Sequence, residues 1–103
     1  MFTPRYQNEQ TDRLVEALLS LENVEEAYRF LEDVLTIQEM KSITQRLEVA
    51  VMLRAKETYQ EIVRKTGAST TTIGRVNRSL QYGAEGYNLV LDRLGDASGT
   101  QQK

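Results

Sequence analysis

The sequence predicts an all-α chain of six helices that contains a helix-turn-helix. Apolar residues recur at steps of three and four along most of its length, which is the period of an amphipathic helix. The single proline is Pro4, and runs of β-branched residues are absent apart from the three threonines at 70–72. Neither observation fits a sheet, so helices are expected throughout.

Three helices are expected in the first half of the chain. The first runs from about Gln7 to Leu19, and the second begins after Asn23, a good N-cap residue. Thr36 and Glu39 have the spacing of a capping box, in which each side chain bonds the other residue's backbone N–H. A third helix therefore opens at Thr36, and we expect it to reach residue 54 to 56.

The third helix is apolar on more than one side. One stripe consists of Ile37, Met40, Ile43, Leu47, Ala50 and Val51, and outside it lie Val49, Met52 and Leu53. Such a helix requires burial from two directions. A second copy of the chain would supply the missing cover, and symmetric dimers are the commonest oligomers. We therefore predict a homodimer; the alternative is a monomer whose own helices surround this one.

A helix-turn-helix is expected at about residues 58–82. Thr58 and Glu61 have capping-box spacing, and Gly67 follows the first helix where a left-handed backbone suits glycine. Ser69 can cap the second helix, whose apolar stripe is Ile73, Val76 and Leu80. Gly83 ends that helix, and a last amphipathic helix follows with Tyr87, Val90, Leu91 and Leu94 on one face.

The outer face of the second helix suits a polyanion, since it has hydroxyls, two guanidinium groups and no acid. Residues 41–82 hold eight basic side chains against three acids, whereas residues 1–40 hold three against nine. Nucleic-acid binding depends on this local charge rather than on the net charge of −2. The predicted DNA-binding residues are Gln60, Arg64, Ser69, Thr70, Thr71, Thr72, Gly74, Arg75 and Arg78. The alternative is a merely solvated, solubilising face.

Composition excludes several kinds of protein. The 103 residues contain no cysteine and no histidine, which removes disulfides, the commonest metal ligands and the usual general base. We predict neither a metal site nor an enzyme, because the carboxylates at Glu25, Glu26, Glu32 and Asp33 read as one exposed face. No apolar run is long enough to span a membrane, and a cytoplasmic location is expected. One domain should cover residues 6–95, between a frayed N-terminus (1–5) and a disordered tail (96–103).

Several motifs resemble the Trp repressor superfamily, in particular its YerC/YecD-like branch of small bacterial proteins. They are Thr-Ile-Gln-Glu at 36–39, Gln-Arg at 45–46, Thr-Gly-Ala-Ser-Thr-Thr-Thr-Ile-Gly-Arg at 66–75, and Asn-Arg-Ser-Leu at 77–80. The resemblance covers roughly residues 7–95. It implies a six-helix chain intertwined with a second copy into a dimer, two helix-turn-helix heads and a role in transcriptional control. The superfamily's prototype clamps L-tryptophan between two arginines, and the positions matching its ligand contacts are Thr36, Arg46, Arg75 and Ser79.

One departure from that pattern argues against tryptophan as corepressor. The prototype has glycine directly after the recognition-helix arginine, which leaves room for the indole ring, and here the position is Val76. A packed interior does not easily absorb an added isopropyl group. Arg46 then either binds another, anionic effector or pairs with an acid such as Asp33 or Glu39.

Together these observations predict a sequence-specific transcriptional regulator that binds double-stranded operator DNA as a dimer and needs no cofactor. The alternative is a helical protein–protein interaction module that uses the same fold without reading DNA. Salt separates the two, because phosphate contacts weaken steeply with ionic strength and an apolar docking surface does not.

Overall fold

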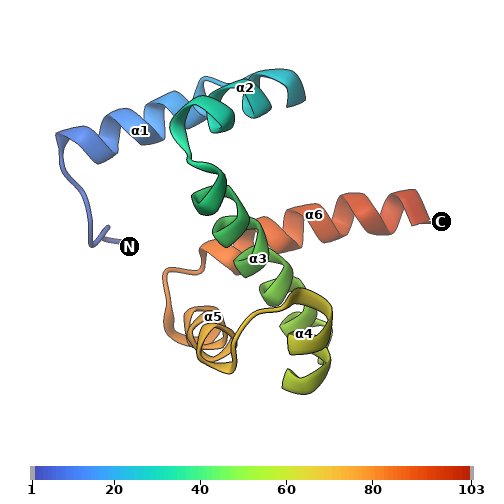
Figure 1. The fold of residues 1–103 in the computed structure, drawn as a ribbon. Helices are drawn as coiled ribbons and strands as arrows, with labels where there is room; N and C mark the ends of the chain where they lie inside the picture. The colour runs from blue at the N-terminus through green and yellow to red at the C-terminus, as the bar shows by residue number, and fades with distance from the viewer. Residues whose placement is uncertain (1, 103) are drawn as a thin grey trace. The chain divides into compact units, whose positions relative to one another are not determined.

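The computed structural model describes the backbone of residues 2–102 and the side chains of residues 2–95. This part of the chain consists of α-helices without a β-strand, which confirms the predicted fold class. The helices, drawn in Figure 1, are α1 (Glu9–Leu19), α2 (Val24–Val34), α3 (Ile37–Arg54), α4 (Tyr59–Thr66), α5 (Thr70–Tyr82) and α6 (Gly86–Gln102). They divide into two compact units, Met1–Met40 and Lys41–Lys103.

Side-chain caps set the starts of the first three helices. The Asn8 side chain caps α1 by accepting from the Thr11 N–H over 2.8 Å, so α1 begins slightly later than the predicted Gln7. Asn23 caps α2, as predicted, through the Glu26 N–H. The capping box before α3 is confirmed in both directions: Thr36 N–H donates to the Glu39 carboxylate, and Glu39 N–H donates to the Thr36 hydroxyl.

The turn between α3 and α4 contains an unusual backbone conformation. Lys56 adopts a left-handed φ of +66°, and Glu57 N–H donates to the carbonyl of Met52, as in a Schellman helix end. Left-handed backbone is costly for a residue with a Cβ. No sequence signal for this turn was available, because glycine is the residue that usually marks it.

The helix-turn-helix forms as predicted. Thr58 caps α4 by accepting from the Glu61 N–H, Gly67 ends it at φ +76°, and Ser69 caps α5 by accepting from the Thr72 N–H. Only half of the expected capping box at Thr58 is made, since the Glu61 carboxylate bonds to Arg64 instead. α4 packs against α5, and α5 against α6.

The hydrophobic core lies in the unit that contains the helix-turn-helix. Its buried members come from α3 to α6 and are Val49, Ala50, Met52, Ile62, Ala68, Ile73, Val76 and Leu91. No buried polar side chain accompanies them within the described residues. Burial of both Ile73 and Val76 fixes which face of α5 points inward, and hence which face is left for solvent.

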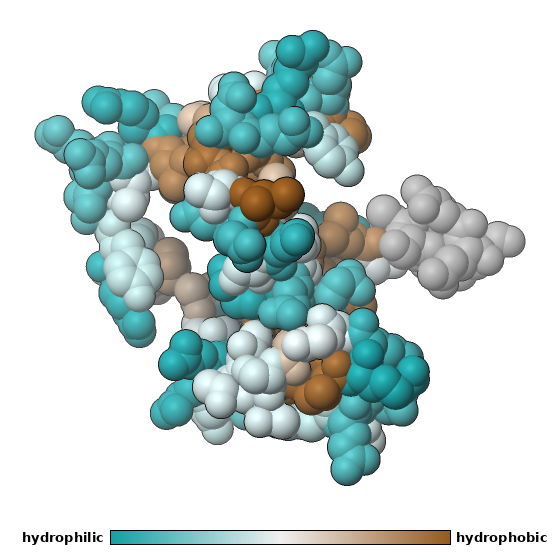
Figure 2. Space-filling view, viewed as in Figure 1, coloured by the Kyte–Doolittle hydropathy of each residue, from teal (hydrophilic) through white to brown (hydrophobic). Residues whose placement is uncertain are grey.

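The unit Met1–Met40 contains no buried residue among those described. The apolar faces of α1 and α2 are instead strongly exposed: Leu19 is 80% exposed and Val24 73%. Brown, apolar surface is visible over these helices in Figure 2. Exposed apolar faces of this extent are typical of surfaces that bind another molecule.

α6 continues as helix to Gln102, past the predicted domain end at residue 95. The side chains of residues 96–103 lie outside the described residues, so the disordered tail stays a prediction. The fraying of residues 1–5 also stays a prediction; residues 2–5 belong to no helix.

Candidate nucleic-acid interface

Helix α5 presents a continuous polar face to solvent. Ile73 and Val76 are buried, whereas Thr70, Thr71, Arg75 and Arg78 are all exposed. The 3.6-residue period of the helix separates the two sets. Four of the predicted DNA-binding side chains are therefore brought onto one accessible surface, which we call the α5 ridge (Thr70, Thr71, Arg75 and Arg78). In Figure 2 the surface over the helix-turn-helix is mostly pale or teal, with one brown, apolar patch.

The two arginines of the α5 ridge are electrostatically uncompensated. The ion pairs found among the described side chains join Arg29 to Glu25, Arg54 to Asp92, Arg64 to Glu61 and Lys65 to Glu57. Neither Arg75 nor Arg78 takes part in one, and α5 itself contains no acid. Both guanidinium groups are thus available for a planar, two-pronged hydrogen bond to phosphate or to a guanine edge.

The N-terminal turn of α5 provides backbone donors beside the ridge. The Ser69 hydroxyl accepts from the Thr72 N–H over 3.1 Å and donates to the Thr72 hydroxyl over 3.1 Å. Thr72 is half-buried and turned toward this cap, so its side chain is less accessible than those of Thr70 and Thr71. The first N–H groups of a helix have no partner within the helix, and they attract anions.

Gly74 lies in the middle of α5 without a packing reason for being glycine. It is half-buried, yet nothing outside its own helix backbone and chain neighbours comes within 4 Å of the place that a Cβ would occupy. Glycine within a helix costs roughly 1 kcal/mol relative to alanine. The open space beside it is compatible with close approach of another molecule.

On α4, Gln60 is exposed but Arg64 is already engaged. Arg64 Nη2 lies 2.7 Å from Glu61 Oε2, and both side chains remain substantially exposed. The hydrogen bond and charge of Arg64 hold the pKa of Glu61 below its ordinary value, and the same contact raises the pKa of Arg64. This contact occupies part of the Arg64 guanidinium group, so Glu61 competes with a phosphate for Arg64.

The predicted effector residues belong to both units of the chain. Arg46, Arg75 and Ser79 are exposed in the unit Lys41–Lys103, whereas Thr36 belongs to the other unit. Arg46 Nη1 donates to the Ser42 hydroxyl over 2.7 Å, a partner that sequence reasoning had not considered. Val76 is only 2% exposed and belongs to the core.

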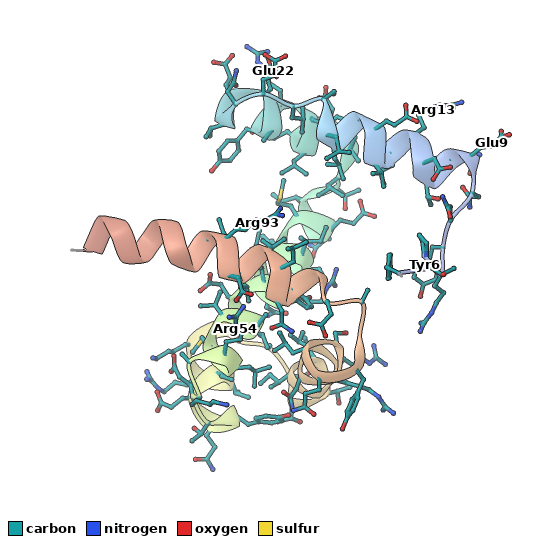
Figure 3. All side chains as sticks on the ribbon, turned by 180° about the vertical axis from the view of Figure 1, so that it is seen from behind. Tyr6, Glu9, Arg13, Glu22, Arg54 and Arg93 are labelled. Atoms are coloured by element: carbon teal, nitrogen blue, oxygen red, sulfur yellow. The ribbon has the colours of Figure 1, made fainter. Side chains whose placement is uncertain are left out.

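Sequence reasoning also missed the polar contacts that join α5 and α6 to the neighbouring helices. Asn77 Nδ2 donates to the Tyr59 hydroxyl, linking α5 to α4, and Asn88 Nδ2 donates to the carbonyl of Leu80, linking α6 to α5. Arg54, labelled in Figure 3, extends from the end of α3 to Asp92 and to the carbonyl of Asn88 on α6. These contacts join residues on different helices, and no local sequence pattern predicts them.

The part of the chain that the structure describes contains neither a cluster of metal ligands nor a membrane-spanning helix. No group of three or more acids could hold a metal ion there. Within the same residues, none of the helices has the length and apolarity needed to cross a bilayer.

Comparison with known proteins identifies relatives over most of the chain. Residues 9–95 match the family described as Trp repressor protein. The uncharacterized protein YerC of Bacillus subtilis (strain 168) is 49% identical over 90 residues, which cover 87% of this chain and 86% of YerC. A TrpR-like protein from Eubacterium eligens ATCC 27750 has a similar solved structure, with 55% identity, a TM-score of 0.82 and coverage of 86% of this chain and 92% of that one. A candidate Trp repressor from Staphylococcus aureus superposes with the same TM-score at 46% identity, covering 86% and 89%.

Proposed function

Since this chain belongs to the Trp repressor family, we propose that it is a sequence-specific transcriptional regulator that binds operator DNA as a homodimer through α5. The fold is that of a family of regulators and not of enzymes. Its relatives are bacterial, and a regulator that binds a bacterial chromosome works in the cytoplasm, so we propose that location for this chain.

One observation carries this proposal: the α5 ridge offers hydroxyls and two unpaired guanidinium groups on a helix without acids. The face of α5 opposite the ridge, which includes Ile73, is buried, and its packing holds the helix with the α5 ridge pointing outward. Helix-turn-helix proteins insert such a second helix into the major groove. The alternative of a solubilising face does not account for the absence of acids from all thirteen residues of α5.

We assign the contacts by the chemistry of each group. Ser69, Thr70 and Thr71 lie at the N-terminus of α5, where hydroxyls and free N–H groups suit a phosphate. Arg75 and Arg78 can each donate a bidentate hydrogen bond to the edge of a guanine, and a threonine methyl can contact the methyl of thymine. Gln60 and Arg64 on α4 would hold the DNA backbone, Arg64 in competition with Glu61.

The homodimer is supported by the unburied apolar faces of the unit Met1–Met40 and by the mixed exposure of α3. Ile43 and Val51 of α3 are each 42% exposed, although Val49 and Ala50 of the same helix are fully buried. A second copy that covers these faces would create two recognition helices related by a two-fold axis. Operators for such dimers have two half-sites about one helical turn of DNA apart.

The test is selection of random DNA duplexes by the purified protein at two salt concentrations. We expect recovery of a two-fold-symmetric site whose affinity falls steeply between the two conditions, because each phosphate contact releases a condensed counterion. An interaction module that docks on another protein predicts no enriched sequence. Failure to enrich any sequence at low salt would refute the proposal.

A further inference from the structure

A hollow of about 740 Å³ opens between α3 and α4. Its walls come from the second unit alone: α3, the turn that follows it and the end of α4. It shares no lining residue with the predicted DNA-binding or effector positions. One lining residue, Val51, belongs to the apolar side of α3 that the proposed second copy would cover, but the DNA contacts proposed above do not account for the polar residues of the hollow.

The charges that line this hollow are balanced but not all paired. Lys65 Nζ lies 2.9 Å from Glu57 Oε1, and these two groups neutralise each other. Lys41 and Glu48 also line the hollow, and neither forms an ion pair among the described side chains. They are two turns apart on the same face of α3, a separation of roughly 10 Å along the helix axis.

We propose that the hollow binds a small dipolar molecule whose carboxylate meets Lys41 and whose ammonium meets Glu48. A separated cation and anion match a ligand with both charges, whereas a singly charged ligand would leave one of them without a partner. The apolar side chain of Met52 also lines the hollow, which favours an organic ligand with an aliphatic body over an inorganic ion.

Such a ligand would act on the helix-turn-helix through contacts that already exist. Gln45 and Thr66 both line the hollow, and Gln45 Nε2 donates to the carbonyl of Thr66 over 3.2 Å. The Thr66 hydroxyl in turn accepts from the Ala68 N–H in the turn before α5. A molecule anchored on α3 at Lys41 and Glu48 would lie against Gln45 and Thr66 and so hold this turn in place. Its effect on DNA binding rests on the proposed function, but its binding does not.

The experiment is an NMR titration of the ¹⁵N-labelled full chain with zwitterions of increasing charge separation: glycine, γ-aminobutyrate and ε-aminocaproate. ε-Aminocaproate has the longest distance between its two charged groups, so we expect it to bind best. Its binding should cause saturable chemical-shift changes at Thr44, Gln45 and Thr66. A small ligand in an open hollow should bind in about the millimolar range. Caproate and hexylammonium, which each carry one charge, should bind about two- to fivefold more weakly than ε-aminocaproate, because each loses one exposed ion pair.

Two charge-removing variants test the assignment. Lys41→Met and Glu48→Gln should each weaken ε-aminocaproate binding by about two- to fivefold, the range of an exposed ion pair, since both side chains are exposed. Arg13→Met and Glu16→Gln on α1 are matched controls and should bind as the native chain does; the spectra also report whether every variant is folded. Shifts that do not saturate, equal binding of the singly charged probes, or unchanged binding by both hollow variants would overturn the proposal. No DNA is present, so these outcomes are independent of the DNA selection.

Discussion

Gln45 of α3 donates a hydrogen bond of 3.2 Å from its side-chain amide to the carbonyl oxygen of Thr66, the last residue of α4. Carbonyls in the last turn of a helix have no acceptor role within that helix. Thr66 is half-buried, so water reaches this carbonyl less readily than it reaches an exposed one. The bond therefore satisfies a backbone acceptor and fixes the end of α4 directly before the turn into α5.

Replacement of Gln45 by methionine should lower the free energy of unfolding by about 1 kcal/mol, the typical net value of one hydrogen bond. Methionine has a similar length and removes only the donor. Urea unfolding followed by circular dichroism measures the change, at one fixed protein concentration because an oligomer's stability depends on it. Gln38→Met, at an exposed position of the same helix, is the control and should change little. Equal stability of the two variants would mean that the bond contributes nothing.

Arg75→Ala and Arg78→Ala should each weaken binding to the selected operator by about 1–3 kcal/mol if the arginine reads a base. Both guanidinium groups are exposed and unpaired within the described structure, so their loss should leave folding unaffected. Fluorescence anisotropy against operator and random DNA measures the effect. Arg29→Ala removes an arginine whose side chain is 75% exposed on α2, and should bind normally.

The two kinds of DNA contact differ in these titrations. Loss of a base contact weakens the operator more than random DNA, whereas loss of a phosphate contact weakens both and reduces the salt slope by about one. If neither Arg75→Ala nor Arg78→Ala changes the affinity for either DNA, the α5 ridge is not the binding surface.

Gly74→Ala should have opposite effects on stability and on DNA binding. Alanine stabilises a helix by about 0.5–1 kcal/mol relative to glycine, and a Cβ at this position meets open space. Thermal unfolding should therefore shift upward. Operator affinity should fall, because the new methyl group would occupy the space in which DNA approaches. A variant that is more stable and binds DNA unchanged would show that no molecule approaches closely at Gly74.

Local signals in the sequence were sufficient to predict the elements that position the interface. Asn23, Thr36 and Ser69 cap helices as their residue types predict, and Gly67 adopts the left-handed backbone expected of it. These features depend on interactions within a few residues, which a sequence displays directly. The outward direction of the α5 ridge likewise follows from the period of its apolar residues.

The remainder of the site depends on contacts between distant residues. The bonds from Asn77 to Tyr59 and from Gln45 to Thr66 each join separate helices, and asparagine and glutamine have many alternative partners. Lys56 adopts a left-handed backbone because the chain must turn there, against its own preference. The sequence analysis predicted a capping box between Thr58 and Glu61 and missed the pairing of Glu61 with Arg64, which leaves that box half made.

Glu61→Gln should strengthen DNA binding, by roughly two- to fivefold, the range of an exposed ion pair. Glutamine removes the carboxylate that pairs with Arg64, and so frees the guanidinium group for the proposed phosphate contact. Because the pKa of Glu61 is lowered by Arg64, the pair persists as the pH falls to the ordinary carboxylate range and is lost only below it. The gain of the variant should therefore be constant from neutral pH down to about pH 5. Double substitution with Arg64→Ala should remove the gain; its persistence would place the effect elsewhere.

L-Tryptophan should not bind saturably to the native protein. Val76 follows Arg75, one of the arginines that match ligand-clamping positions, and its side chain is 2% exposed within the core that includes Ile62 and Ile73. Moving it aside to admit an indole would leave a cavity in that core, and the cost of such cavities grows with their volume. Isothermal titration calorimetry with L-tryptophan should give only heats of dilution, and operator affinity should be the same with and without the amino acid. Stoichiometric binding with release of heat would show that the core repacks around Val76.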